Sequence, residues 1–160
     1  MCDTPTIHSV QIMSALFIEH FDMRQAAGGA ARIDLGGVHF SMAAPGPFPV
    51  TINPHMLVLV RCPASHTGLA ALEVRFMRGD EQVARNVQPL SVEPGKFGYN
   101  LVQAELSFDE PSTVEAHCRI DQGDVVVVPL TMNPPADDPA PAPTAPAAGG
   151  WTGTPAAENG

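Results

Sequence analysis

The chain has 160 residues, and its 17 acidic and eight basic side chains give a formal net charge of -9 at pH 7. Because a surface of that sign repels phosphate, we expect neither nucleic acid nor an anionic membrane as a partner. Arginine outnumbers lysine by seven to one, and alanine and proline are abundant, which is typical of a bacterium with a GC-rich genome.

The three cysteines, Cys2, Cys62 and Cys118, predict free thiols, since an odd and sparse set does not make a disulfide framework. The N-terminus carries Asp3 where an export signal would have a basic residue, and the apolar stretch at 12–18 is broken by a polar side chain. No window of the sequence has the length and apolarity that would span a bilayer. These features together predict a cytoplasmic protein.

The N-terminal half predicts three extended segments. Residues 9–18 and 32–42 are rich in apolar and β-branched side chains, and the pair Gly36-Gly37 indicates a bulge or a tight bend. Between these two segments, residues 19–27 suit one short helix, which the glycine pair after it would end. Residues 56–62 form a continuous apolar run between two prolines, which is typical of a buried strand.

The C-terminal half alternates apolar and polar side chains, with the period of a strand that is buried on one face. The turn at 78–81 (RGDE) joins the first two strands into a hairpin, and we interpret its Arg-Gly-Asp as turn chemistry instead of an adhesion motif. Pro129 confines the last strand to a sheet edge or a bulge. The expected strands are residues 72–76, 83–87, 102–108, 114–120 and 125–132.

Seven to nine such strands predict an all-β fold in which two antiparallel sheets pack face to face, a β-sandwich of immunoglobulin-like or C2-like outline. A closed β-barrel is the alternative, because alternation alone does not say whether a sheet closes on itself. We expect this domain to cover residues 1–133. Residues 134–160 hold seven Pro, eight Ala and four Gly, with no Val, Ile, Leu, Met or Phe, which predicts a disordered tail.

Candidate metal ligands are sparse among the six histidines and three cysteines. His20 with Asp22, and Cys62 with His66, are ligand-like pairs, but neither has a second pair nearby to complete a zinc site. Neither a nucleophile elbow nor a phosphate-binding loop is present. We therefore predict no catalytic, cofactor-binding or metal-binding residues. A metal-dependent hydrolase that uses His20, Asp22 and one of the distant histidines is a less favoured alternative.

Trp151 is the single tryptophan and lies in the predicted tail, where a lone aromatic side chain could anchor the tail in a partner's pocket. The leading functional prediction is a non-enzymatic binding or scaffolding module that contacts protein partners. The alternative is a structural subunit of a larger assembly, because an exposed edge at 125–128 could pair with another copy of the chain.

One resemblance agrees with this prediction. Residues 14–19 (SALFIE), a following Gly-Gly pair, and residues 47–50 (PFPV) before an apolar strand resemble a family of small uncharacterised bacterial proteins. The resemblance covers most of residues 1–133 and none of the tail. It implies a β-sandwich domain of unknown function and names no activity, cofactor or site residue.

Overall fold

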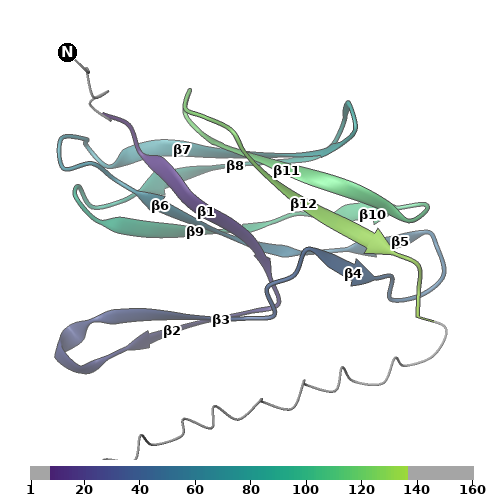
Figure 1. Ribbon diagram of the computed structural model, residues 1–160. Coiled ribbons are helices and arrows are strands. Elements are labelled where there is room, and N and C mark those ends of the chain that lie inside the picture. Colours follow the sequence, from purple (N-terminus) through teal and green to yellow (C-terminus); the bar gives the residue numbers. More distant parts are fainter. Residues whose placement is uncertain (1–7, 137–160) are drawn as a thin grey trace, which may run out of the picture.

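The computed structural model describes residues 8–136, which fold almost entirely into β-strands (Figure 1). Strands hold 63% of these residues, and one short 3-10 turn at Ala27–Gly29 is the remaining regular element in this part of the chain. The all-β prediction is therefore confirmed. Within residues 8–136 no helix has the length and apolarity needed to cross a membrane.

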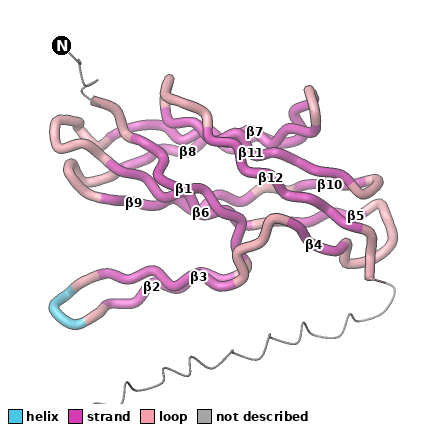
Figure 2. Tube along the Cα trace, viewed as in Figure 1, coloured by secondary structure: helices cyan, strands magenta, loops and turns pink. Residues whose placement is uncertain are grey.

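Two sheets form the body of the molecule and lie face to face as two layers (Figure 2). The three-stranded sheet is antiparallel and has the order β1 (Gln11–Ile18), β6 (His55–Arg61) and β9 (Phe97–Gln103). The five-stranded sheet has the order β4 (Ser41–Ala43), β12 (Val126–Asn133), β11 (Ser112–Ile120), β7 (Leu69–Arg78) and β8 (Glu81–Ser91). None of the sheets closes on itself, so the β-sandwich is confirmed and the closed alternative is wrong.

Two smaller pairs complete the twelve strands, three more than the upper expectation of nine. β5 (Val50–Ile52) pairs with β10 (Leu106–Phe108), and β2 (His20–Gln25) pairs with β3 (Ala31–Gly36) as a hairpin that extends beside the body (Figure 1). The additional strands are short, which is why alternation did not separate them from their neighbours.

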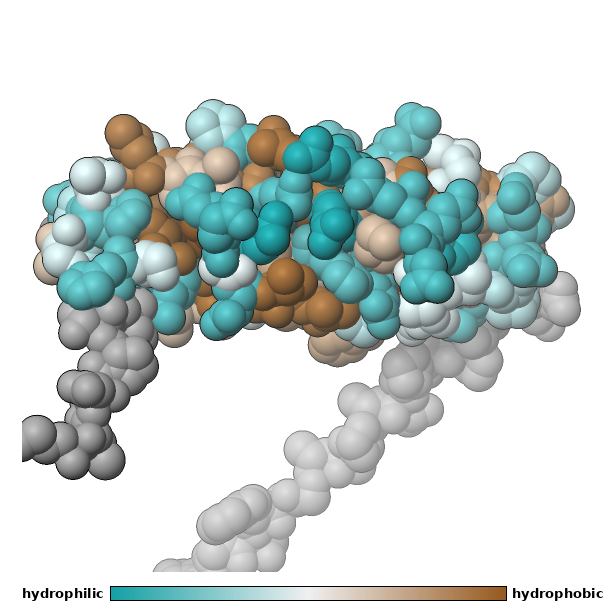
Figure 3. Space-filling model, turned by 90° about the horizontal axis from the view of Figure 1, so that it is seen from above, coloured by the Kyte–Doolittle hydropathy of each residue, from teal (hydrophilic) through white to brown (hydrophobic). Residues whose placement is uncertain are grey.

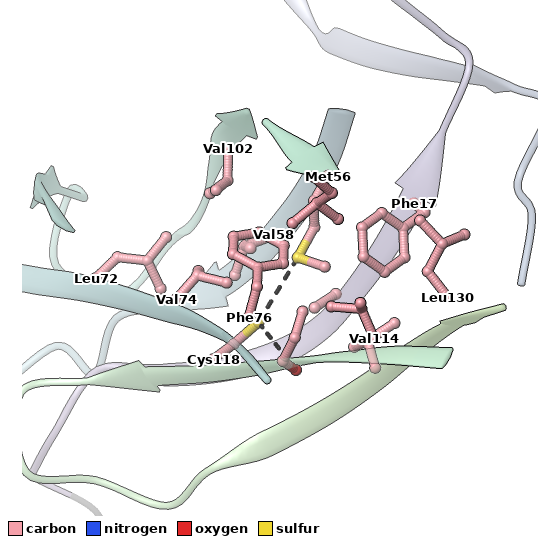
Figure 4. Close-up of a cluster of buried hydrophobic side chains, with 14 of the residues drawn as sticks. Phe17, Met56, Val58, Leu72, Val74, Phe76, Val102, Val114, Cys118 and Leu130 are labelled. Atoms are coloured by element: carbon pink, nitrogen blue, oxygen red, sulfur yellow. Dashed lines mark hydrogen bonds between the residues drawn. The ribbon is translucent and has the colours of Figure 1, made fainter. Parts of the chain in front are cut away.

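The core lies between the two sheets and contains no buried polar or charged side chain among the described residues. Val74 of β7 pairs with Cys118 of β11, and Phe76 pairs with Ala116, so the apolar sides of the predicted alternating strands meet in one layer. Phe76 and Met56 come from opposite sheets and lie in the same cluster (Figure 4). Each such side chain contributes roughly 1.5–3 kcal/mol through burial.

Side-chain amides join the two sheets along one side of the sandwich. Asn86 and Gln88 of β8 donate hydrogen bonds to the backbone carbonyls of Gln103 and Leu101 of β9, both at 3.2 Å. On the other side, β1 contacts β12 and β11. The two sheets are therefore in contact along both sides of the sandwich, although no backbone ladder links them.

The predicted helix at 19–27 is wrong, because this segment contains strand β2. Phe21 pairs with Leu35 and Met23 with Ile33, so apolar side chains recur with the period of a strand and collect on one face of the hairpin. The glycine pair that was expected to end a helix instead reverses the chain, since Gly28 and Gly29 both have positive φ, 78° and 77°.

The single strand predicted at 102–108 is interrupted at Ala104 and Glu105. There the chain leaves the three-stranded sheet and continues as β10 beside β5. The prediction for Pro129 is confirmed, since β4 pairs with β12 only from Thr131 onward and leaves Pro129 on an open edge. The predicted disordered tail lies outside the described residues, apart from residues 134–136.

Candidate functional site

The outer face of the three-stranded sheet is apolar. Leu57 and Ile18 are only 1% and 2% exposed, yet neither belongs to the core cluster between the sheets. Successive strand residues point to opposite faces, so Met56 and Val58 enter the core while Leu57 between them points outward. The register aligns two outward rows across the sheet: Leu16, Leu57 and Leu101, and Ser14, Leu59 and Tyr99.

The β2–β3 hairpin turns its apolar face toward this sheet. The ring centroid of Phe21 lies 5.3 Å from that of Tyr99, and the Tyr99 hydroxyl donates to the Met23 sulfur at 3.9 Å. Ile33 and Leu35 share the face of the hairpin that carries Met23 and Phe21. The hairpin is thus a partial third layer on the face of the sheet to which Leu57 points.

Two pockets lie where the hairpin leaves the body. One of about 300 Å³ is lined by Ile18, Glu19, His20, Phe21, His55 and Leu101. The second, of about 250 Å³, shares Ile18, Glu19 and His55 with the first and adds His39, Met42, Ile52, Asn53 and Pro54. We call the two pockets and the adjoining apolar faces of the hairpin and the sheet the hairpin cleft.

Backbone geometry fixes the polar end of the hairpin cleft. The backbone N–H of Glu19 donates to the carbonyls of Gly36 and Gly37, at 3.2 and 3.1 Å. Gly37 has a φ of +61°, and a Cβ there would collide with the Glu19 carboxylate, so this bend accepts only glycine without displacing Glu19. β3 ends at Gly36, and the close approach of Gly37 to Glu19 constrains the position of the Glu19 side chain.

His39 also lines this pocket, and one of its ring nitrogens has no hydrogen-bond partner in the described part of the chain. Its Nδ1 lies 2.9 Å from the carbonyl oxygen of Gly37, and because a carbonyl only accepts, Nδ1 carries the proton. Nε2 is then the acceptor, and it is buried without a hydrogen-bond partner in the described part of the chain. His39 also stacks near Phe17, with ring centroids 6.4 Å apart.

The structure gathers three histidines at the hairpin cleft, namely His20, His39 and His55. Within residues 8–136, however, no group of three or more His, Cys, Asp or Glu side chains is arranged to hold a metal ion. Asp22 alternates onto the same face of β2 as His20, opposite the apolar face that carries Phe21. Within the described residues, His20 and Asp22 therefore do not form a metal site with a third ligand.

Cys62 and His66 do come together, with Sγ 4.0 Å from Nδ1. The same Nδ1 accepts a 2.9 Å hydrogen bond from the backbone N–H of Gly68, so its lone pair is already engaged. Cys62 is also fully buried. The pair therefore stabilises the 63–68 loop and does not form an accessible nucleophile with its base.

The other groups singled out from the sequence have structural roles. Cys118 is fully buried, and burial raises the pKa of its thiol to about 12, so it is a core residue and not a reactive one. Arg78 of the Arg-Gly-Asp turn donates from Nη2 to the carbonyl of Ser107 at 2.6 Å, and its guanidinium lies 5.1 Å from the Phe108 ring centre. Trp151 lies outside the described residues.

A further pocket of about 480 Å³ lies where the start of β1 meets the β11–β12 turn. Asp124 is the one ionisable side chain among its lining residues, which are Ser9, Val10, Gln11, Ile12, Ile120, Gly123, Asp124 and Val126. The hairpin cleft differs from it in its four titratable residues, Glu19, His20, His39 and His55.

The outer face of the five-stranded sheet is mostly hydrophilic, with scattered apolar side chains (Figure 3). Glu73 pairs with three arginines, at 2.5 Å to Arg85, 3.4 Å to Arg119 and 3.7 Å to Arg75. The hydrogen bond from Arg85 is the main reason that the pKa of Glu73 is lowered. On the solvent side of the hairpin, the Arg24 guanidinium likewise lowers the pKa of Asp34.

No protein-family model matches this chain, and a search of curated proteins found no match either. The resemblance to small bacterial β-sandwich proteins therefore stays a prediction. Function has to be argued from the hairpin cleft itself.

Proposed function

We propose that the protein is a non-enzymatic binding module whose hairpin cleft holds an extended apolar segment of a protein partner. The observation that carries the proposal is the outward row of large apolar side chains on the three-stranded sheet, which the hairpin covers only in part. Leu101 is 42% exposed, Met23 47% and Phe97 71%, so apolar surface continues from the cleft to solvent.

The backbone of the hairpin supports an extended peptide as the occupant. Among the described strands, β2 pairs only with β3 and β3 only with β2, so each has one edge whose backbone groups lack a strand partner. A peptide strand can hydrogen-bond to such an edge while its alternate side chains enter the apolar space beside it. An anionic amphiphile fits less well, since the ionised group that both pockets share is the carboxylate of Glu19.

Peptide selection tests the proposal. Random twelve-residue peptides displayed on phage are selected on the full-length chain, and the affinity of the best binders is measured by fluorescence anisotropy. We expect peptides rich in large apolar residues, whose affinity falls at least tenfold for Leu101→Glu, because this change places a charge in the apolar wall.

Leu69→Glu is the matched control. Leu69 is 69% exposed on the other sheet, so we expect this variant to bind the selected peptides as the wild type does. Peptides that bind Leu101→Glu as tightly as the wild type would contradict the proposal. Thermal unfolding of both variants confirms that each chain is folded.

The alternative of a structural subunit also stays a prediction. β12 is unpaired on its outer side before Thr131, and Val127 is 47% exposed there, which would allow pairing with a second copy. Pro129 has no N–H to donate at the middle of this edge, which weakens such pairing. Light scattering at increasing protein concentration measures the association directly.

A further inference from the structure

We propose that the polar end of the hairpin cleft recognises a positively charged hydrogen-bond donor, an ammonium or guanidinium group, on the segment that the apolar part of the cleft holds. This inference rests on the proposed function and adds the chemistry of the partner. The expected partner segment therefore combines a basic group with large apolar side chains.

Glu19 provides the negative charge. Its carboxylate lines both pockets, and within residues 8–136 it takes part in none of the six salt bridges. Its position is constrained, because its backbone is bonded to the Gly36-Gly37 bend and its side chain lies where a Cβ of Gly37 would be. A carboxylate held at a cleft without a cation from its own fold favours a cation from a ligand.

His39 provides a second acceptor. Because Nδ1 donates to the carbonyl of Gly37, Nε2 accepts, and this buried atom has no donor among the described residues. A buried acceptor without a donor is unfavourable, so a ligand N–H relieves the cost if the groups that cover Nε2 shift to admit it. An ammonium has three donors and a guanidinium five, enough to serve Glu19 and His39 together.

The rest of the pocket agrees with this chemistry. Asn53 and His55 add groups able to accept hydrogen bonds, and neither Lys nor Arg lines either pocket. Met42, Ile52 and Pro54 form an apolar wall against which the methylene stem of a lysine or arginine side chain would pack. An anionic group would instead meet the carboxylate of Glu19 in a lining that contains neither Lys nor Arg.

Three six-carbon probes test the inference. The full-length chain, labelled with ¹⁵N, is titrated by NMR with n-hexylammonium, n-hexanol and n-hexanoate, which share an apolar tail and differ in their head group. We expect hexylammonium to shift the amide signals of Glu19, His39 and His55, and to bind about tenfold more tightly than hexanol. Hexanoate should bind most weakly.

Glu19→Gln is the decisive variant, because it removes the charge and keeps the shape. We expect the preference for hexylammonium over hexanol to fall to about twofold or less, while the affinity for hexanol is unchanged. Glu81→Gln, at the exposed first residue of β8, is the matched control and should keep the full preference.

The outcomes separate the two proposals. If hexanol shifts signals of the cleft but hexylammonium binds no more tightly, or if Glu19→Gln keeps the preference, the inference about charge is wrong and the apolar cleft stands. If none of the three probes shifts these amide signals, the cleft does not bind apolar chains, and both proposals fail.

Discussion

The two outer faces of the sandwich differ in the side chains that they direct outward. On the five-stranded sheet, charged side chains point outward, and Glu73 offsets the repulsion between Arg75 and Arg85, which face each other across β7 and β8. On the three-stranded sheet, the outward rows contain leucines and Tyr99, and an additional hairpin lies against them. The charged side chains are stable in contact with water, whereas the apolar side chains are stabilised when another element buries them.

The cover over the apolar face is incomplete. The described ring and hydroxyl contacts between hairpin and sheet involve one aromatic pair, Phe21 with Tyr99, and the sulfur of Met23. Leu57 is buried, but Leu101 in the same row is 42% exposed. The hairpin therefore has two roles: it buries part of the apolar face, and it forms one wall of the hairpin cleft.

The largest expected effect compares one leucine on each face. Leu57→Ala should lower the free energy of unfolding by about 2–4 kcal/mol, because Leu57 is buried under the hairpin. Leu69→Ala, at an exposed position of the five-stranded sheet, should change it by less than about 0.5 kcal/mol. Urea unfolding measures both, and equal losses for the two variants would mean that the hairpin does not cover Leu57.

A smaller effect is expected from loosening the cover itself. Phe21→Ala removes the contact with Tyr99, which should destabilise the docked hairpin by about 1–2 kcal/mol. Hydrogen exchange should then speed up about tenfold in β2 and β3 and stay unchanged in β11, since an isolated two-stranded hairpin is marginally stable. Phe40→Ala, at a side chain that is 64% exposed, is the control, and the idea is wrong if it has the same effect.

The smallest effect concerns the charged face and depends on pH. The pKa of Glu73 is lowered in the folded state, so its stabilising effect is complete above the pKa of the unfolded chain and disappears as the pH falls through the folded value. We expect the wild type to be more stable than Glu73→Gln at pH 7, with a difference that shrinks below about pH 4.3. Unfolding curves between pH 7 and 3 measure this, and a difference that is constant across that range would contradict it.

The sequence predicted the parts of the fold that depend on local alternation. Residues 72–76 and 114–120 alternate strictly and became neighbouring strands, β7 and β11. The continuous apolar run at 56–62 predicted a buried strand, and both faces of β6 are indeed covered over Met56–Val60. This run was the one sequence feature that indicated an apolar outer face on the three-stranded sheet.

The candidate site itself could not be predicted from the sequence, because it depends on contacts between distant segments. Nothing near Tyr99 in the chain indicates that Phe21 lies against it. The histidines at the cleft come from β2, the segment after β3, and the start of β6. They meet at the end of β1, because Ile18 pairs with His55 and the backbone N–H of His39 donates to the carbonyl of Phe17. The alternation of apolar and polar side chains in residues 20–25 was the sequence feature that indicated strand β2. The glycine pair after it also fits the end of a short helix, which is why a helix was predicted there.

The central claim is that the apolar outer face under the hairpin is an open binding surface and the charged face is not. Methyl NMR of the full-length chain, titrated with the tightest selected peptide, tests it most directly. We predict shifts of the methyl signals of Leu16, Leu59, Leu101 and Met23, with those of Leu69, Val87 and Val127 unchanged. Shifts confined to the second group would contradict the account.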